Sequence, residues 1–555
     1  MSAPAPTPRA SLTLTSLVGL GLRARVSART RSLQNESHWR THTMRAQHDA
    51  LLNLLRQASG TRFGRAHDFP RISAIADPTQ RLTAFRAAVP ISDWYAFQDD
   101  IRDMREGGQP DILWPGRVDL FAQTSGTTAG DKFIPVTKAM LRSNFLASLD
   151  IFAHLSARGL SLPRITGGRC LFLGGSTDLE VNEHGIKTGD LSALVSPLIR
   201  WPISKIYSPG PEIALMSDWP AKIEAMAELS LRQDIRFISG MPSWSLVLME
   251  RVVEMAREQG RDVSCIRDVW PNLTVFVHGG VKYDPFQTRV NQVYSGSKDT
   301  DIPHRLELYP ASEGFLAIQD RAGDPGMRLL SDGGNFFEFV PLEQIDDDNP
   351  EAFSADAVEK GQRYVVVMTT CAGLWRYVLG DVVEFDSIPA RIDSSGGDGP
   401  ARLRIVGRHR HFINAFGENI IVEHIEHAVA KAAEMTGLTV GEFTAAPIYP
   451  APGQRAGLQL ALEVETKPDG AISRFTEAFD EAIKAINVDY TTKRSDDLGM
   501  APPTVTPMPM GAFHRWLEAR GKLGGQHKCP RCANGRDIID AVLLDSGRPD
   551  TTTTA

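Results

Sequence analysis

Several features are scarce or missing in this 555-residue chain, and each absence narrows the class of protein. Five cysteines in a chain of this length are too few and too scattered for a disulfide framework, so we expect a reducing compartment. No window approaches the roughly 20 apolar residues that a transmembrane helix needs. We therefore expect a cytoplasmic protein that is neither secreted nor stably inserted in a membrane.

The sequence also lacks a strong excess of charge of either sign. The chain has 60 Lys and Arg against 67 Asp and Glu, and neither sign forms a stripe that could follow a nucleic-acid backbone. Nucleic acid is therefore not an expected partner. The hydrophobic content of 42% and the length favour an ordinary globular protein with two or more domains.

Acidic residues are absent from the first 35 positions, which carry five Arg together with Ser, Thr and Ala. This composition is typical of an organelle transit peptide. However, the apolar stretch near residues 17–26 is short, and no small-residue cleavage site follows it. We favour a frayed N-terminal helix, with the ordered fold beginning near Met44.

Helical and strand patterns alternate through the middle of the sequence. Helical spacing at residues 219–231 and 244–256 is interleaved with short β-branched runs at 273–277 and 364–368, which indicates an α/β fold. Beyond a loop rich in Ser, Gly, Asp and Pro, two strands and a helix predict a small α+β domain. The predicted division is a tail with a first helix at 1–43, a large domain at 44–407, a mobile C-terminal domain at 408–540 and a disordered tail at 541–555.

Residues 124–132 (TSGTTAGDK) follow a strand-like run and could hold phosphate groups. Backbone N–H groups and hydroxyls in such a loop can face phosphate oxygens, and glycines give the backbone its freedom. The loop lacks the Gly-Lys-Ser/Thr of a P-loop, and an ordinary turn is the alternative. The candidate phosphate-binding residues are Ser125, Gly126, Thr127, Thr128 and Lys132.

A second motif is YPASEG at residues 309–314. The ring of Tyr309 suits stacking on adenine, and the carboxylate of Glu313 suits Mg²⁺, which prefers oxygen ligands. Ser312 is a further candidate contact of the nucleotide. The alternative interpretation is the end of a strand with an exposed acid.

Two further motifs carry an acid and a cation. In WRYVLGD, residues 375–381, Asp381 follows a glycine and could accept both ribose hydroxyls, although a hairpin turn is the alternative. In GRHRHFINAFGEN, residues 407–419, Arg408 could face the ribose or the phosphates. Here the alternative is a basic surface loop.

These motifs resemble, in order and spacing, those of the adenylate-forming superfamily. The run NVDYTTKR at 487–494, followed by Phe513, Trp516 and GGQHKCPR at 524–531, resembles the C-terminal domain of the acyl acid amido synthetases. That family is named Gretchen Hagen three and is known from plant auxin and jasmonate conjugation. TRFGRAH at 61–67 and VHGGVKY at 277–283 agree, so the resemblance spans roughly residues 44–535.

The resemblance implies a fold and a reaction. It implies a large N-terminal α/β domain with a small β-barrel, which binds ATP and the acyl substrate, and a smaller rotating α+β domain. It further implies a monomer that adenylates a carboxylic acid with ATP and Mg²⁺ and passes the acyl group to an amine, such as that of an amino acid. Glu313 would be the metal ligand and Lys528 the cation that closes over the site.

The sequence also departs from the pattern of the plant amido synthetases. His527 and Trp375 each stand where we expect Tyr, and the segment after Gly407 is closer to acyl-CoA ligases. A ligase that uses a thiol acceptor is therefore the first alternative, and a non-catalytic nucleotide-binding homologue is the second. Cys529 and Cys532 have no second cysteine pair to complete a zinc site and are interpreted as structural.

Overall fold

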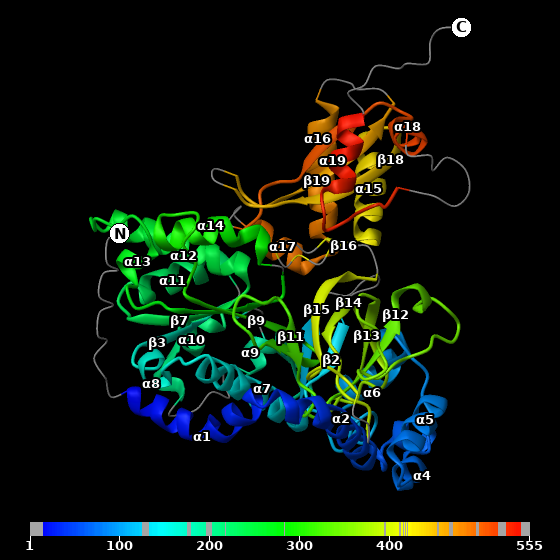
Figure 1. The fold of residues 1–555 in the computed structure, drawn as a ribbon. Helices are drawn as coiled ribbons and strands as arrows, with labels where there is room; N and C mark the ends of the chain where they lie inside the picture. Colours follow the sequence, from blue (N-terminus) through cyan, green and yellow to red (C-terminus); the bar gives the residue numbers. More distant parts are fainter. Residues whose placement is uncertain are drawn as a thin grey trace.

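In the computed structural model, the chain forms a large body with a smaller C-terminal body above it (Figure 1). Fifteen stretches of the chain are described. The described residues are 15–124, 132–174, 179–195, 203–216, 218–281, 283–392, 396–409, 412–413, 416, 418, 420–451, 454–465, 470–495, 499–519 and 529–545.

An eleven-stranded sheet runs through the large body. The strands from β9 to β6 pair in parallel, whereas those from β9 to β12 pair antiparallel. In sheet order the strands are β12 (Phe336–Pro341), β13 (Arg363–Thr369), β14 (Tyr377–Ser387), β15 (Arg402–Arg408), β11 (Met327–Leu329), β10 (Gly314–Gln319), β9 (His304–Ala311), β8 (Val275–Gly279), β7 (Ile235–Gly240), β3 (Arg169–Phe172) and β6 (Tyr207–Ser208).

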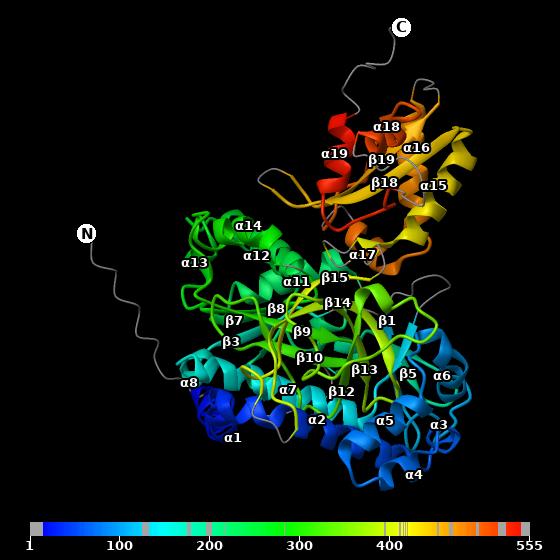
Figure 2. The ribbon, with the colours of Figure 1, turned by 45° about the vertical axis from the view of Figure 1, so that its right-hand side comes forward.

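Helices cover both faces of the parallel half, because its strands are apolar on both sides. On β8, Phe276 packs in one core cluster, whereas Val275 and Val277 pack in another on the opposite face. Figures 1 and 2 show one helix layer at the lower edge and the other beside the C-terminal body. The lower layer is α1 (Ser16–Gln34), α7 (Lys138–Ala157) and α8 (Leu162–Ile165), and the upper layer is α11 (Trp219–Ser230), α12 (Pro242–Glu258), α13 (Ile266–Val269) and α14 (Asp284–Ser295).

A second, four-stranded sheet lies beside short N-terminal helices and carries the strand that precedes the predicted phosphate loop. Its order is β2 (Lys132–Pro135), β1 (Leu120–Thr124), β5 (Lys187–Gly189) and β4 (Glu180–Val181). The helices are α2 (Glu36–Ala58), α3 (Arg62–Ala66), α4 (Phe69–Ala74), α5 (Pro78–Ala88), η1 (Trp94–Phe97) and α6 (Gln98–Arg105), with α9 (Leu191–Val195) and α10 (Pro211–Ala214) further along the chain.

The ordered fold begins earlier than Met44, so that expectation is wrong. Helix α1 buries Val26 and Leu33, and Arg29 donates hydrogen bonds to Asp150 and Asp332 at 2.8 and 2.6 Å. The sequence predicted a helix here but not its packing against the fold, because Arg and Ser residues dilute its narrow apolar face. The helix is therefore an integral part of the lower layer.

The C-terminal body is an α+β layer, as expected. The strands β18 (Val440–Ile448), β19 (Gly457–Val464) and β20 (Thr504–Met508) form its sheet. Helices α15 (Val422–Thr436) and α16 (Ala471–Lys484) cover one face, and α18 (Ala512–Glu518) and α19 (Asp537–Asp545) cover the other. The short strands β16 (Phe412–Ile413) and β17 (Ile420–Ile421) precede it, and α17 (Val488–Arg494) follows α16.

The two bodies touch through an aromatic contact. The ring of Phe416 lies 5.6 Å from that of Trp244 on α12 and 6.2 Å from that of Phe286 on α14. The predicted tail at 541–555 was placed too early, because α19 continues to Asp545 and buries Val542. The predicted domain boundaries otherwise stay a prediction.

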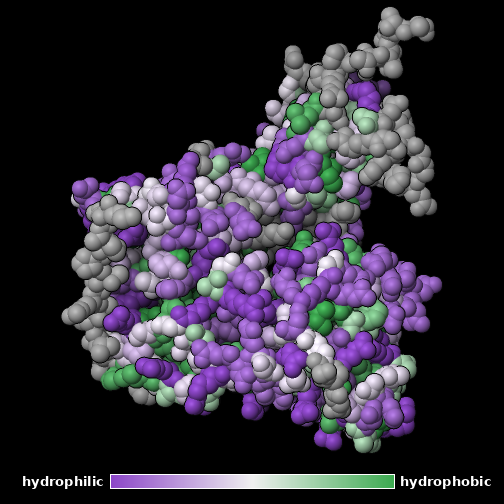
Figure 3. Space-filling view, viewed as in Figure 1, coloured by the Kyte–Doolittle hydropathy of each residue, from purple (hydrophilic) through white to green (hydrophobic). Residues whose placement is uncertain are grey.

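The surface agrees with the sequence composition. The coloured part of the face in Figure 3 is mostly hydrophilic, with apolar patches scattered over it. Within the described ranges, no helix combines the length and the apolarity needed to cross a bilayer.

A buried ionic cluster ties α16 to α17 in the C-terminal body. The carboxylate of Asp480 accepts hydrogen bonds from Tyr490 at 2.6 Å and from Arg494 at 2.8 and 3.0 Å, and Lys484 lies 2.9 Å away. Burial raises the pKa of Asp480, but these donors outweigh burial and hold the pKa below its ordinary value. The folded state therefore favours the ionised carboxylate.

We expect Asp480→Asn to lower the free energy of unfolding by about 3 kcal/mol at pH 7, because it leaves Arg494 buried without its counter-charge. A depressed folded-state pKa contributes stability above the unfolded pKa of about 3.9 and loses it as pH falls through the folded pKa. Urea unfolding at pH 7 and below pH 4 measures the difference in the free energy of unfolding between the wild type and Asp480→Asn. The exposed Glu481→Gln is the control, and an equal gap between wild type and Asp480→Asn at both pH values would contradict the assignment.

Candidate nucleotide site

The antiparallel half of the large sheet curves so that distant strands meet. Three strands, β15, β11 and β10, separate β14 from β9 in the sheet order. Nevertheless, the hydroxyl of Tyr309 on β9 donates a hydrogen bond to Asp381 on β14 at 2.7 Å. Irregular pairing in β10 and β14 accompanies this curvature, as expected of β-bulges.

Asp381 is the hub of the site. Its Oδ2 accepts the Tyr309 hydroxyl, and its Oδ1 accepts the Nε–H of Arg408 at 2.6 Å. Asp381 and Arg408 are also register partners on β14 and β15, so the backbone fixes their approach. A carboxylate has about four lone-pair sites, so Asp381 keeps the capacity for further hydrogen bonds.

The electrostatic state of the hub follows from these contacts. Asp381 raises the pKa of the Arg408 guanidinium, although burial works against it. Burial, and then the neighbouring Asp381 charge, raise the pKa of Tyr309 well above its ordinary value. Tyr309 is therefore a neutral donor and Arg408 a permanent cation.

Glu313 lies in the two-residue turn that joins β9 to β10, closed by the pair Ala311 and Gly314. Its side chain is buried, and the hydroxyl of Tyr377 donates a hydrogen bond to its carboxylate. Burial raises the pKa of Glu313, while Lys132, Tyr377 and Arg408 act in the opposite direction. Its predicted neighbour Ser312 is half-buried in the same turn.

Lys132 is the first residue of β2, and its positive charge interacts with the negative charge of Glu313. Burial lowers the pKa of its amine, and the Glu313 charge works against that effect. Lys132 pairs in register with Thr124, the last residue of β1, so the two ends of the predicted phosphate loop lie next to each other. The loop residues Ser125, Gly126, Thr127 and Thr128 lie outside the described residues, as does Lys528.

The structure thus brings together five residues that the motifs singled out separately: Lys132, Tyr309, Glu313, Asp381 and Arg408. The ring of Tyr309 is only 3% exposed and packs against buried apolar side chains, so stacking on adenine stays a prediction. Its hydrogen bond to Asp381 was not foreseen. Tyr377 was missed as well, although it stands inside the WRYVLGD motif.

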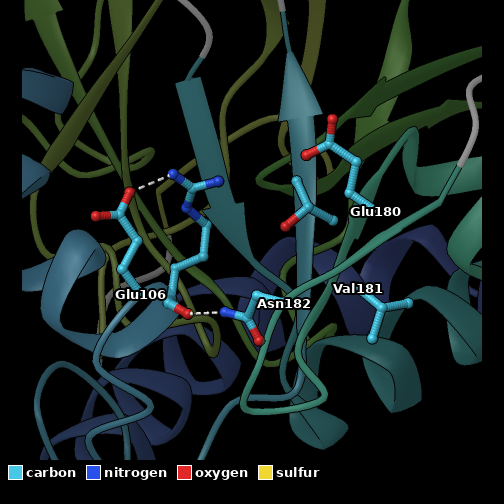
Figure 4. A pocket seen from close by; sticks show the side chains of 6 residues that line it. Glu106, Glu180, Val181 and Asn182 are labelled. Carbon is cyan, nitrogen blue, oxygen red and sulfur yellow. Dashed lines mark hydrogen bonds and ion pairs between the residues drawn. The ribbon is translucent and has the colours of Figure 1, made fainter.

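A separate surface cleft of about 260 Å³ lies at the edge of the four-stranded sheet (Figure 4). Arg105 on its wall pairs with Glu106 at 2.6 Å, and Asn182 donates to the Arg105 carbonyl at 2.6 Å. None of the residues predicted for the nucleotide lines this cleft. We therefore place the candidate site at the Asp381 hub.

The fold is that of the adenylate-forming enzymes. The structure of GH3.15 acyl acid amido synthetase matches with a TM-score of 0.54 over 97% of both chains, at 16% identity. That of 2-hydroxyisobutyryl-CoA ligase, in complex with 2-HIB-AMP and CoA, matches with a TM-score of 0.52 over 90% of this chain and 91% of the other, also at 16% identity.

Sequence comparison gives the family. The GH3 family N-terminal domain matches residues 33–200 and 180–299, the central domain residues 328–392 and the C-terminal domain residues 423–537. This chain belongs to the GH3 family. It is 25% identical to indole-3-acetic acid-amido synthetase GH3.3 of Arabidopsis thaliana, over 84% of this chain and 86% of that protein. It is 26% identical to indole-3-acetic acid-amido synthetase GH3.8 of Oryza sativa subsp. indica, over 54% and 49%.

We expect Tyr309→Phe to lower the free energy of unfolding by about 1.5–3 kcal/mol, because it removes a buried hydrogen bond to a charged acceptor. Urea unfolding at pH 7 measures the loss. Tyr449→Phe, which removes a hydrogen bond of 3.0 Å to the neutral carbonyl of Asn534, is the matched control. Equal unfolding of the two variants would show that the hub does not depend on the tyrosine hydroxyl.

Proposed function

We propose that this chain uses ATP to convert a carboxylic acid into an acyl-adenylate and then transfers the acyl group to the amine of an amino acid. Membership of the GH3 family supports the proposal, as do the relatives named indole-3-acetic acid-amido synthetases. The observation that carries it is the joining of Lys132, Glu313 and the Asp381–Arg408 pair at one place.

The described residues suit a nucleotide with its metal ion. Asp381 would accept the ribose hydroxyls, and Lys132 and Arg408 would face the phosphates. Glu313 is a buried carboxylate, and carboxylate oxygen is a ligand that Mg²⁺ prefers. When bound, Mg²⁺ would offset negative charge on the phosphates. Ser125, Gly126, Thr127 and Thr128 would complete the phosphate contacts, with Ser312 in the adjoining turn.

In the first half-reaction, a carboxylate oxygen of the acid attacks the α-phosphorus of ATP. The bond from that phosphorus to the bridging oxygen breaks, and pyrophosphate leaves. Fixed positive charge from Lys132 and Lys528 would stabilise the charge that develops in this step. The product is a mixed anhydride of the acid and AMP.

In the second half-reaction, the amine nitrogen attacks the acyl carbon. The carbon–oxygen bond to AMP breaks, the nitrogen loses a proton, and an amide and AMP result. Holding the two reactants together supplies much of the rate enhancement. The monomeric state, the cytoplasmic location and the rotation of the C-terminal domain remain part of the proposal.

We expect Glu313→Ala, Asp381→Ala and Lys528→Ala each to lower acid-dependent ATP–pyrophosphate exchange by at least about 100-fold, because each removes a charge that acts on the nucleotide. A screen of carboxylic acids for pyrophosphate release first supplies the acid. Asp347→Ala, in an exposed loop, is the control. Normal exchange in the three variants would show that the site is wrongly placed.

The acceptor is tested separately, because the segment at 407–419 is closer to acyl-CoA ligases. With the purified enzyme, ATP, the acid, an amino-acid mixture and coenzyme A in one tube, we expect mass spectrometry to find the amide in at least about tenfold excess over the thioester, since a tenfold ratio needs only about 1.4 kcal/mol of preference. A thioester without amide would replace the proposed second step by thiol ligation. A non-catalytic protein would release no pyrophosphate with any acid.

A further inference from the structure

Tyr377 contacts the site without being among the residues predicted for it. Its side chain is 2% exposed, and its hydroxyl donates a hydrogen bond to the Glu313 carboxylate. Burial, followed by the nearby Glu313 charge, raises the pKa of Tyr377 well above its ordinary value. The hydroxyl is therefore a neutral donor at any working pH.

The backbone around Tyr377 is held from two sides. In the sheet, Tyr377 pairs with Met368 of β13. On the other side, Ser92 accepts from the N–H of Val378 at 2.9 Å and donates to the carbonyl of Arg376 at 3.1 Å. The start of β14 is therefore fixed before the side chain of Tyr377 reaches Glu313.

Arg376 has the left-handed backbone that only glycine adopts at low cost, with φ at 46°. Its guanidinium explains why this conformation persists. Nε donates to Glu338 at 2.9 Å, and Nη1 donates to the Val89 carbonyl at 2.8 Å. Arg86 also donates to Glu338 at 2.8 Å. This buried cluster directs the Tyr377 side chain toward Glu313.

A tyrosine suits this position for a physical reason. A neutral hydroxyl adds no further positive charge to that of Lys132 and Arg408, which already act on Glu313. A neutral hydroxyl orients the carboxylate and leaves the charge and most of its lone pairs available. Hydrogen-bonded partners behind a ligating carboxylate usually matter nearly as much as the ligand itself.

We propose that Tyr377, fixed by Arg376 and Glu338, is a positioning residue that orients the Glu313 carboxylate toward the divalent cation of the bound nucleotide. The inference rests on the proposed function, since it needs ATP and a metal ion at this place. It assigns to Tyr377 a role that acts through Glu313.

The test is calorimetric titration of the full-length protein with ATP at a series of Mg²⁺ concentrations. We expect Tyr377→Phe to raise the Mg²⁺ concentration that half-maximally strengthens ATP binding by about tenfold, as losses behind a metal ligand usually do. Binding of ATP without Mg²⁺ should stay within about twofold, because affinity scales with interactions lost and none to ATP itself is removed.

Tyr364→Phe is the matched control. Tyr364 is equally buried, and its hydroxyl accepts from the N–H of Glu359 and donates to Gln362, away from Glu313. The Mg²⁺ concentration that half-maximally strengthens ATP binding, here called the half-point, should be the same for Tyr364→Phe as for the wild type. Complexation of ATP by Mg²⁺ in solution is the same in every sample and cannot cause a difference. Arg376→Lys should shift the half-point in the same direction as Tyr377→Phe. Thermal unfolding without nucleotide confirms that each variant is folded at the assay temperature.

The outcomes separate the two proposals. A wild type that binds no ATP, with or without Mg²⁺, contradicts the proposed function. A wild type that responds to Mg²⁺, with Tyr377→Phe and Tyr364→Phe at one half-point, overturns the positioning role. The role is also overturned if Glu313→Gln keeps the wild-type response, since the oriented carboxylate would then not be the ligand.

Discussion

The candidate site depends on the hydrogen bonds that Tyr309 and Arg408 donate to Asp381. Asp381 stands on β14, Arg408 on β15 and Tyr309 on β9, so one carboxylate closes the curved antiparallel half of the sheet. Removal of either donor would leave the buried carboxylate with one hydrogen bond fewer. Arg408 is also the last residue of β15, so the same contact holds the end of that strand.

Much of the fold could be predicted because periodic burial dominates it. The window at 219–231 matches α11, the run at 273–277 overlaps β8 and the run at 364–368 lies in β13, since apolar spacing alone specifies such buried elements. Helix α1 was underestimated because its partners lie far away in the sequence: Arg29 meets Asp150 and Asp332, more than 100 residues away. No local pattern contains that information.

The site could be predicted only in pieces. Motif chemistry identified Glu313, Asp381 and Arg408, because acids and cations beside glycines have few structural uses. The connections between them depend on sheet curvature, which brings β9 to β14 across three intervening strands. For the same reason the hydrogen bond from the Tyr309 hydroxyl to Asp381 was not foreseen, and only the ring of Tyr309 was given a role. Tyr377 carries no charge and so gave no signal.

The charges of the site explain why a ligand would complete it. Burial disfavours the charged form of both Lys132 and Glu313, lowering one pKa and raising the other. Lys132 and Arg408 formally balance Glu313 and Asp381, but burial makes the ionised forms of Lys132 and Glu313 costly to keep. Phosphates beside Lys132 would favour its ammonium form, and a divalent cation beside Glu313 would favour its carboxylate. The nucleotide and its metal together would therefore relieve opposite penalties, whereas either alone would relieve only one.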